Sequence, residues 1–357
     1  MDNPTLCQNL VFNGKFLSAP STGVQRVGRE FIRALTAVTN VTAIAPRRTP
    51  LSDIPESCVL ERHGWLVGQP WEQIDLPRFT RGRRLVGLCN LAPLRGTGIV
   101  MIHDAQTFLT PQSYSPAYVR YYRTLQPLIA RNADLVLTVS NYSAEHLIRF
   151  KVVPESKIVV LPNGVDHINR AAARQAPLPS TLRLKSHYVV SLANTQAHKN
   201  VKILLQAFSL PSLRDVQLVL IGNATPNDFA RAGMPVPENT IFPGWLSDEV
   251  LATLTAGAIC FAFPSLTEGF GLPPMEAMAL GCPAVVAPCG ALPEVCGNAA
   301  LYADPHDPAQ WAKQVLSLME PETHAEASNR GQAHAARFTW QRTVERFVKI
   351  ISQHGFL

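Results

Sequence analysis

The chain has 357 residues, which is too long for one ordinary hydrophobic core and predicts two domains. Hydrophobic residues make up 46% of it, and no run approaches the roughly 18 consecutive apolar residues of a membrane-spanning helix. The first ten residues lack a basic stretch followed by an apolar one, so they do not predict a secretory signal. Seven cysteines, an odd number without a C-x-x-C pair, predict reduced thiols in a cytoplasmic protein and no zinc site.

The net charge of +6 is concentrated in the first half of the chain. Residues 1–180 hold 20 Lys and Arg against 12 Asp and Glu, whereas residues 181–357 have a net charge of −2. This excess predicts contact with an anionic surface such as a phospholipid leaflet or a lipid diphosphate. A solvated arginine-rich face is the alternative, and no nucleic-acid motif accompanies the charge. One short segment holds four of the arginines: Arg78, Arg81, Arg83 and Arg84.

The first half alternates apolar runs with helical patterns. Apolar residues at helical spacing predict a helix that opens at Gly23, with Ser21 and Thr22 as capping candidates. Four apolar runs predict strands at 41–44, 99–102, 135–139 and 158–161. The Pro-containing stretch at 171–186 predicts a linker after this half.

The second half repeats the alternation, which predicts a second parallel sheet covered by helices. Apolar runs and cap signals predict strands at 188–192, 217–221, 241–242, 259–263 and 284–287, and helices at 200–208, 247–254 and 340–353. The expected fold class is therefore α/β.

The most informative segment is the strand–loop–helix–strand unit at 259–287. Glu268 lies in its loop, and Glu276 lies eight residues further on, in a short helix that Pro273 and Pro274 open. Ligands of open α/β sheets bind at the carboxyl edge of the strands, where this loop lies. Amides in the loop can converge on an anion, which suits a sugar nucleotide: Gly269, Phe270, Gly271 and Leu272.

This string, EGFGLPPMEAMALGCPAVV, resembles the E-x7-E signature of the retaining glycosyltransferases of family 4, and the resemblance covers roughly the whole chain. It implies the GT-B fold, with two Rossmann-like domains that face each other across a cleft. The N-terminal, acceptor-binding domain is expected at 1–178, with a returning C-terminal helix at about 340–357. The C-terminal domain, which binds the nucleotide-sugar donor, is expected at 179–339.

The resemblance also implies roles for residues of the donor domain. Glu268 is expected to hold a hydroxyl of the donor sugar and Glu276 the ribose hydroxyls. Lys199, in VSLANTQAHKN, is expected to bind the diphosphate, but the arginine that family members place near it is absent. His198 is a candidate to replace part of that charge. Trp245, together with Phe242 and Gly244, corresponds to the wall of the nucleobase pocket.

Three further segments resemble family landmarks in the N-terminal domain. His103, in IHDAQTF, matches a histidine that hydrogen-bonds the transferred sugar, and a structural histidine at a strand end is the alternative. Gly23, in STGVQRVG, matches a loop whose backbone approaches the donor diphosphate, and a plain helix cap is the alternative. Asn163 and Gly164 are interpreted first as a turn.

The implied activity is transfer of a hexose, with mannose preferred, from a nucleoside diphosphate sugar to a lipid-linked saccharide in cell-surface polysaccharide synthesis. GDP-mannose is the preferred donor, and GDP-fucose and UDP- or dTDP-linked hexoses remain open. Because no D-x-D occurs, we expect a metal-independent enzyme without a cofactor, located in the cytoplasm or on the inner face of the plasma membrane. A GT-B-fold sugar-nucleotide epimerase and a non-catalytic nucleotide-sugar-binding protein are the alternatives.

Overall fold

A computed structural model describes residues 9–19, 23–49 and 57–357 of the chain. The chain divides into two compact units. Unit 1 comprises Met1–Gly164 and Thr339–Leu357, and unit 2 comprises Val165–Phe338. Ser21 and Thr22, the predicted capping residues, lie outside the described residues. Within the described part of the chain, no helix is long and apolar enough to cross a membrane.

Unit 1 is built on a seven-stranded parallel sheet with the strand order β3-β2-β1-β4-β5-β6-β7. The order reverses between β1 and β4, as at the switch point of a Rossmann sheet, so a crevice for ligands is expected at their carboxyl ends. The strands are β1 (Leu10–Asn13), β2 (Val41–Pro46), β3 (Cys58–His63), β4 (Arg84–Gly87), β5 (Ile99–Met101), β6 (Leu135–Thr138) and β7 (Ile158–Val160).

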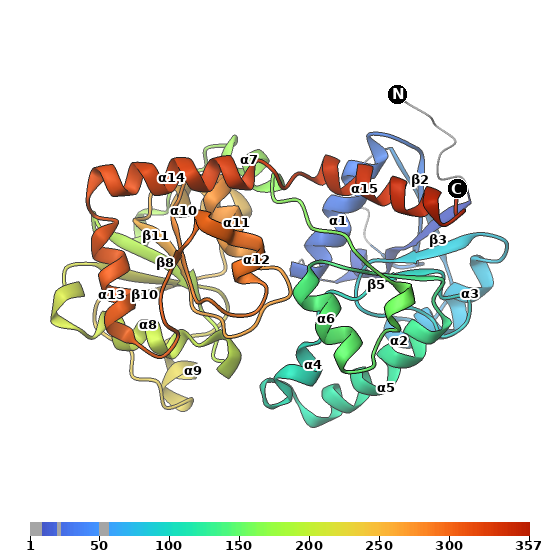
Figure 1. Cartoon of the computed structure of the whole chain (residues 1–357), viewed down its shortest axis with the longest axis horizontal. Helices are drawn as coiled ribbons and strands as arrows, with labels where there is room; N and C mark the ends of the chain where they lie inside the picture. Colours follow the sequence, from blue (N-terminus) through green and yellow to red (C-terminus); the bar gives the residue numbers. More distant parts are fainter. Residues whose placement is uncertain (1–8, 20–22, 50–56) are drawn as a thin grey trace. The chain divides into compact units, whose positions relative to one another are not determined.

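Helical segments lie in most connections between these strands, as is usual for parallel pairing, whereas a loop without a helix links β4 to β5. Figure 1 shows them in blue to green, with the last helix of the unit in red. The α-helices of the unit, with the π-helical segment η2, are α1 (Gly23–Thr36), α2 (Gly68–Pro70), η2 (Trp71–Asp75), α3 (Leu76–Phe79), α4 (Gln106–Leu109), α5 (Pro116–Asn132), α6 (Asn141–Arg149) and α15 (Trp340–Gln353). Short 3-10 segments are η1 (Gly14–Ser18), η3 (Pro111–Ser113) and η4 (Glu155–Lys157).

The C-terminal helix α15 packs on the first helix of unit 1. The ring of Phe347 meets that of Phe31 edge-on, with 5.0 Å between centroids. Thr343 donates its hydroxyl to the carbonyl of Pro162 at 2.8 Å. Gly164 is required here, because a Cβ at this position would lie 2.3 Å from the amide nitrogen of Trp340.

Unit 2 is built on a six-stranded parallel sheet with the strand order β10-β9-β8-β11-β12-β13. Its order reverses between β8 and β11. The strands are β8 (Tyr188–Leu192), β9 (Gln217–Ile221), β10 (Thr240–Gly244), β11 (Cys260–Phe263), β12 (Ala284–Val286) and β13 (Leu301–Tyr302). The helices are α7 (His167–Ala172), α8 (Val201–Phe208), α9 (Pro226–Arg231), α10 (Asp248–Ala256), α11 (Leu272–Ala279), α12 (Leu292–Cys296), α13 (Pro308–Ser317) and α14 (Pro321–Ala335).

The chain passes into unit 2 earlier than the predicted boundary at 178–179. The change falls between Gly164 and Val165, and the return falls between Phe338 and Thr339. Helix α7 belongs to unit 2 because its apolar face joins a buried cluster with Ala252 of α10. A proline-containing segment is only a weak boundary signal when a buried helix precedes it.

Candidate active site

The two loops predicted to carry the donor chemistry meet at the switch point of unit 2. One loop follows β8 and ends in Lys199, and the other follows β11 and holds Glu268. These two strands are neighbours in the sheet, and both loops lie at their carboxyl ends. The backbone joins the loops directly, because the amide of Leu266 donates to the carbonyl of His198 at 2.7 Å.

Lys199 and Glu268 form an ion pair. The Lys199 Nζ lies 2.7 Å from Glu268 Oε1, and the side chains are 23% and 14% exposed. The ammonium also lies 6.0 Å from the centroid of the Phe263 ring. From the sequence, Lys199 was expected to bind the diphosphate of a donor and Glu268 its sugar. Their direct pairing was therefore not predicted. A charged pair that still reaches solvent can open toward a ligand that offers both a phosphate and a hydroxyl group.

A glycine in the next loop fixes the backbone of Glu268. Gly290 has a φ of +63°, and a Cβ there would lie 2.5 Å from the amide nitrogen of Glu268. The neighbouring amide of Ala291 donates to the Glu268 carbonyl at 3.0 Å. The position of the carboxylate is therefore determined by β12 and its loop as well as by its own strand.

Helix α11 begins where the sequence placed an anion site. Its N-cap, Gly271, has a φ of +92°, and no side chain caps the helix. The first-turn amides of a helix have no acceptor within the helix, and Pro273 and Pro274 carry no N–H, so the amides of Gly271 and Leu272 are the ones in this turn that can bind a phosphate. Phe270 is only 5% exposed and meets Phe338 edge-on at 6.0 Å, so its side chain anchors the loop.

Glu276 lies in a short helix, as the sequence predicted, and is the fifth residue of α11. Its Oε1 lies 2.9 Å from the Nε2 of His167, the first residue of α7. The imidazole side chain is 2% exposed and the carboxylate 16%. His167 was not identified from the sequence, since the two residues are 109 positions apart.

The predicted nucleobase wall lies at the edge of the same sheet. Gly244 ends the edge strand β10 with a φ of +78°, and Trp245 follows with 73% of its surface exposed. Three strand spacings, roughly 14 Å, separate β10 from β11. Phe242 is partly buried, and its ring packs against that of Phe229 with 5.4 Å between centroids.

In unit 1, His103 follows β5 and is 6% exposed. Its Nε2 lies 2.8 Å from the carbonyl of Leu88, and its backbone amide donates to Asn90 Oδ1 at 2.8 Å. A carbonyl only accepts, so Nε2 carries the proton and Nδ1 remains as an acceptor. Burial lowers the pKa of His103 to about 4. A neutral ring of this kind can accept a hydrogen bond from a hydroxyl group but cannot supply a proton near neutral pH.

His198 does not supply the cation that is missing beside Lys199. Burial, and then the neighbouring Lys199 ammonium, lower the pKa of His198 to about 4. The ring is therefore neutral at physiological pH, and it is 3% exposed.

These two histidines predict a loss of stability in mild acid. In the unfolded chain their pKa is near 6.5, so between pH 6.5 and about 4 the unfolded chain binds more protons than the folded one. The free energy of unfolding should therefore fall as the pH is lowered through this window. Urea unfolding at pH 7.5 and pH 5 measures this. His198→Gln should weaken the dependence and the exposed His354→Gln should not; equal slopes in all three proteins would contradict the prediction.

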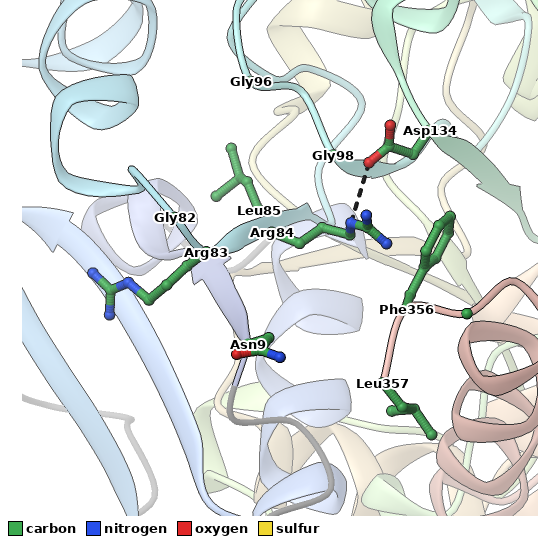
Figure 2. Close-up of a pocket in the computed structure, with 11 residues that line it drawn as sticks. Asn9, Gly82, Arg83, Arg84, Leu85, Gly96, Gly98, Asp134, Phe356 and Leu357 are labelled. Carbon is green, nitrogen blue, oxygen red and sulfur yellow. Dashed lines mark ion pairs between the residues drawn. The ribbon is translucent and has the colours of Figure 1, made fainter.

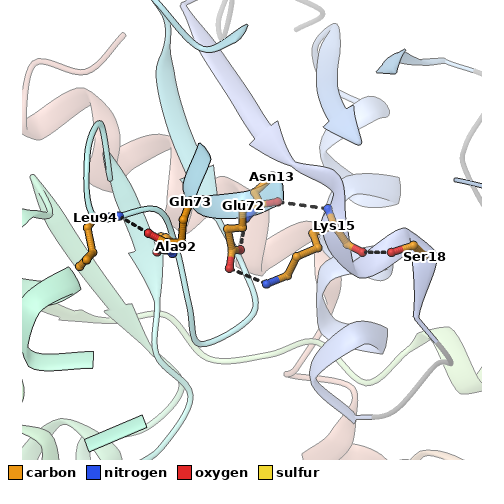
Figure 3. Close-up of polar contacts among 7 residues, drawn as sticks. All are labelled: Asn13, Lys15, Ser18, Glu72, Gln73, Ala92 and Leu94. Carbon is orange, nitrogen blue, oxygen red and sulfur yellow. Dashed lines mark hydrogen bonds and ion pairs between the residues drawn. The ribbon is translucent and has the colours of Figure 1, made fainter. Parts of the chain in front are cut away.

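A buried polar network that the sequence did not reveal lies after β1, beside the switch point of unit 1. The Glu72 carboxylate is 1% exposed and accepts from Asn13 Nδ2 at 2.6 Å and from Lys15 Nζ at 2.5 Å (Figure 3). Lys15 is 20% exposed, so it presents a paired cation at the edge where ligands of such a sheet bind. Sequence spacing does not reveal this network, because Glu72 lies in η2, 59 positions after Asn13.

Gly23 opens α1 in unit 1, and a Cβ there would meet no atom within 4 Å. The fold therefore does not require glycine at this position, which leaves close approach of a ligand as a reason for it.

A hollow of about 460 Å³ lies at the opposite, amino-terminal edge of the unit 1 sheet (Figure 2). Arg84 lines it, with its Nε 3.2 Å from Asp134 Oδ2 and its guanidinium 3.8 Å from the ring centroid of Phe356. Because parallel α/β sheets bind ligands at the carboxyl edge, this hollow is not part of the candidate site.

Comparisons with known proteins agree with the two-unit organisation. A sequence model described as Glycosyltransferase Family 4 matches residues 21–168, and one described as Glycosyl transferases group 1 matches residues 186–321. The chain is 31% identical over 264 residues to O-antigen chain mannosyltransferase B of Escherichia coli, covering 68% of this chain and 67% of that protein. It is 23% identical over 353 residues to O-antigen chain mannosyltransferase RfbU of Salmonella typhimurium, covering 92% and 95%. The chain matches only 33% of the length of the serotype-specific mannosyltransferase WbdA of Escherichia coli, at 27% identity.

Solved structures share the fold at low sequence identity. Anabaena HepE in complex with UDP and glucose has a TM-score of 0.72 at 17% identity, and covers 96% of this chain and 99% of its own. WaaG, a glycosyltransferase of lipopolysaccharide biosynthesis, has a TM-score of 0.70 at 17% identity, with the same coverage.

Two Rossmann-like sheets and these matches define a glycosyltransferase with the GT-B fold, which confirms the predicted fold class. The chain belongs to glycosyltransferase family 4.

Proposed function

We propose that this glycosyltransferase moves mannose from GDP-mannose to a lipid-linked saccharide during synthesis of a cell-surface polysaccharide, with retention at the anomeric carbon. The arrangement of Lys199, Glu268 and the first turn of α11 at one switch point carries the proposal. The similarity to O-antigen mannosyltransferases favours mannose over other hexoses.

In this proposal the donor lies across the carboxyl ends of the unit 2 strands. The nucleobase lies near Trp245, Glu276 binds the ribose, and the diphosphate lies on Lys199 and the amides of 269–272. Glu268 holds a hydroxyl of the sugar and supports the positive charge that develops at the anomeric carbon. Gly23 and the Nδ1 atom of His103 are the proposed contacts from unit 1. The diphosphate charge is held by an ammonium and amides, so no metal is needed; unchanged turnover in EDTA is the expected result.

Donor choice can be tested by thermal shift with GDP, UDP and dTDP. We expect GDP to raise the unfolding temperature most; stabilisation by UDP alone would overturn the choice of GDP-mannose. Product analysis with GDP-mannose and no acceptor separates transfer from the epimerase alternative, because an epimerase would convert the donor by itself. Absence of transfer to any lipid-linked saccharide while GDP still binds would favour the non-catalytic alternative.

His167 is expected to position the ribose-binding carboxylate. His167→Ala removes the hydrogen bond to Glu276, so the affinity for GDP should fall by about tenfold, or about 1.4 kcal/mol. His167→Gln keeps a donor and should lose less. Titration calorimetry with GDP and 2′,3′-dideoxy-GDP checks the cause: discrimination between them should shrink in His167→Ala. Full discrimination in that variant would show that His167 does not act through Glu276.

A further inference from the structure

Three consecutive apolar side chains of unit 1 are exposed to solvent. Trp65, Leu66 and Val67 follow the edge strand β3 and are 84%, 38% and 66% exposed. The chain has five tryptophans, and besides Trp65 only Trp245 of unit 2 is exposed. A contiguous apolar tip of this kind marks a surface that binds something.

The tip, residues 65–67, is held outward by an ordered backbone. Asp75 is 6% exposed, and its Oδ2 accepts from the amides of Trp65 at 2.9 Å and Leu66 at 3.0 Å. Gly64 makes the turn with a φ of +81°, where a Cβ would lie 2.4 Å from the same oxygen. The fold therefore positions these side chains away from its own core.

Exposed arginines flank the tip. Arg47 and Arg48 line a hollow of about 380 Å³ with it, and the guanidinium of Arg47 lies 4.3 Å from the ring centroid of Trp65. A second hollow, of about 520 Å³, lies along η2 and α3, next in the chain. It is lined by Gln73, Ile74, Pro77, Arg78, Arg81, Leu94 and Arg95. None of the described residues that line either hollow is acidic.

Two arginines of the cluster noted in the sequence, Arg83 and Arg84, are neutralised by acidic partners. Arg83 makes a two-bond contact with the Glu61 carboxylate at 2.7 and 2.8 Å, and Arg84 pairs with Asp134. Arg78 also lies 3.8 Å from Asp75 Oδ1. Among the described residues, the arginines around the tip and the second hollow that have no acidic partner are therefore Arg47, Arg48, Arg81 and Arg95.

We propose that the tip and its five flanking arginines, at positions 47, 48, 78, 81 and 95, bind an anionic phospholipid bilayer. Trp, Leu and Val suit the boundary between headgroups and acyl chains, and guanidinium groups bind lipid phosphates. The stacking of Arg47 on Trp65 places both chemistries at one point. Charge complementarity favours this partner over a neutral protein surface. This proposal rests on the proposed function, because a lipid-linked acceptor would lie in a membrane. Binding of the protein to a bilayer, however, requires no sugar transfer.

The test is binding to vesicles in the absence of donor and acceptor. Trp245→Phe leaves Trp65 as the one exposed tryptophan, and Trp71, Trp311 and Trp340 are buried, so a change of fluorescence on addition of vesicles reports on the tip. We expect a blue shift with vesicles containing phosphatidylglycerol and little change with phosphatidylcholine alone. Arg47→Gln/Arg48→Gln should weaken flotation binding by about 25-fold, at about fivefold for each arginine. Trp65→Ser/Leu66→Ser should abolish the binding while leaving the unfolding temperature unchanged.

Lys313→Gln/Arg330→Gln, which removes two exposed cations from unit 2, is the matched control and should bind vesicles as the parent does. Equal binding to both kinds of vesicle, or no effect of the tip and arginine variants, would overturn the proposal. Concentration-dependent dimerisation that Trp65→Ser removes, without vesicle binding, would instead assign the tip to a second copy of the chain. None of these results bears on sugar transfer, which a soluble acceptor measures separately.

Discussion

Glu268→Gln should lower turnover with GDP-mannose by about two to three orders of magnitude. The amide has the shape of the carboxylate, and Gly290 and Ala291 continue to fix the backbone, so the loop should keep its place. What is lost is the negative charge that the proposal places beside the developing positive charge of the sugar. Initial-rate measurements with saturating donor and acceptor give the effect on kcat.

The affinity for GDP is the control for this prediction. GDP carries no sugar, so Glu268→Gln should bind it within about threefold of the parent protein by calorimetry. Glu268→Asp keeps the charge but shortens the side chain, and it should retain more turnover than the glutamine variant. Full turnover in Glu268→Gln would remove Glu268 from the proposed chemistry.

Local sequence patterns were sufficient to predict most of the strands of unit 2. The predicted strands at 188–192 and 217–221 coincide with β8 and β9 of that unit, and the predicted helix at 340–353 coincides with α15 of unit 1. These segments are continuous apolar runs or strongly amphipathic ones, bounded by cap and turn residues. The fold class followed from their alternation, and it is confirmed.

Three strands of unit 1 were missed for local reasons. β1 and β4 have four residues each, and β4 begins with Arg84 and ends with Gly87. β3 carries Glu61, Arg62 and His63, because an edge strand is only half covered and tolerates charge. Short or charged strands of this kind are extended because they pair with neighbouring strands. A local sequence pattern does not reveal that pairing.

The site was predictable as a set of residues but not as a set of contacts. The motif identified Lys199, Glu268 and Glu276, but their partners come from distant positions. Lys199 and Glu268 are 69 positions apart, and His167 and Glu276 are 109 apart. Such pairs depend on strand order, and the order β8-β11 arises only when the sheet assembles.

Lys199→Met should weaken GDP binding by about 10- to 100-fold, because a hydrogen-bonded charge on the diphosphate is lost. Turnover should fall further, since the leaving diphosphate gains negative charge as the bond breaks. No arginine stands beside Lys199, and His198 is neutral, so these residues offer no second cation. Calorimetry with GDP and initial rates with GDP-mannose measure the two effects.

The ion pair in the site makes a double-mutant cycle decisive for this prediction. If Lys199 binds the diphosphate directly, Lys199→Met and Lys199→Met/Glu268→Gln should lose GDP affinity equally, because Glu268 does not touch the nucleotide. If Lys199 serves only to hold Glu268 at 2.7 Å, Lys199→Met should bind GDP normally, and the double variant should turn over no more slowly than Glu268→Gln. Only the first outcome fits a lysine that leaves its carboxylate partner for the donor. The second would make it a positioning residue and move the diphosphate site to the amides at the start of α11.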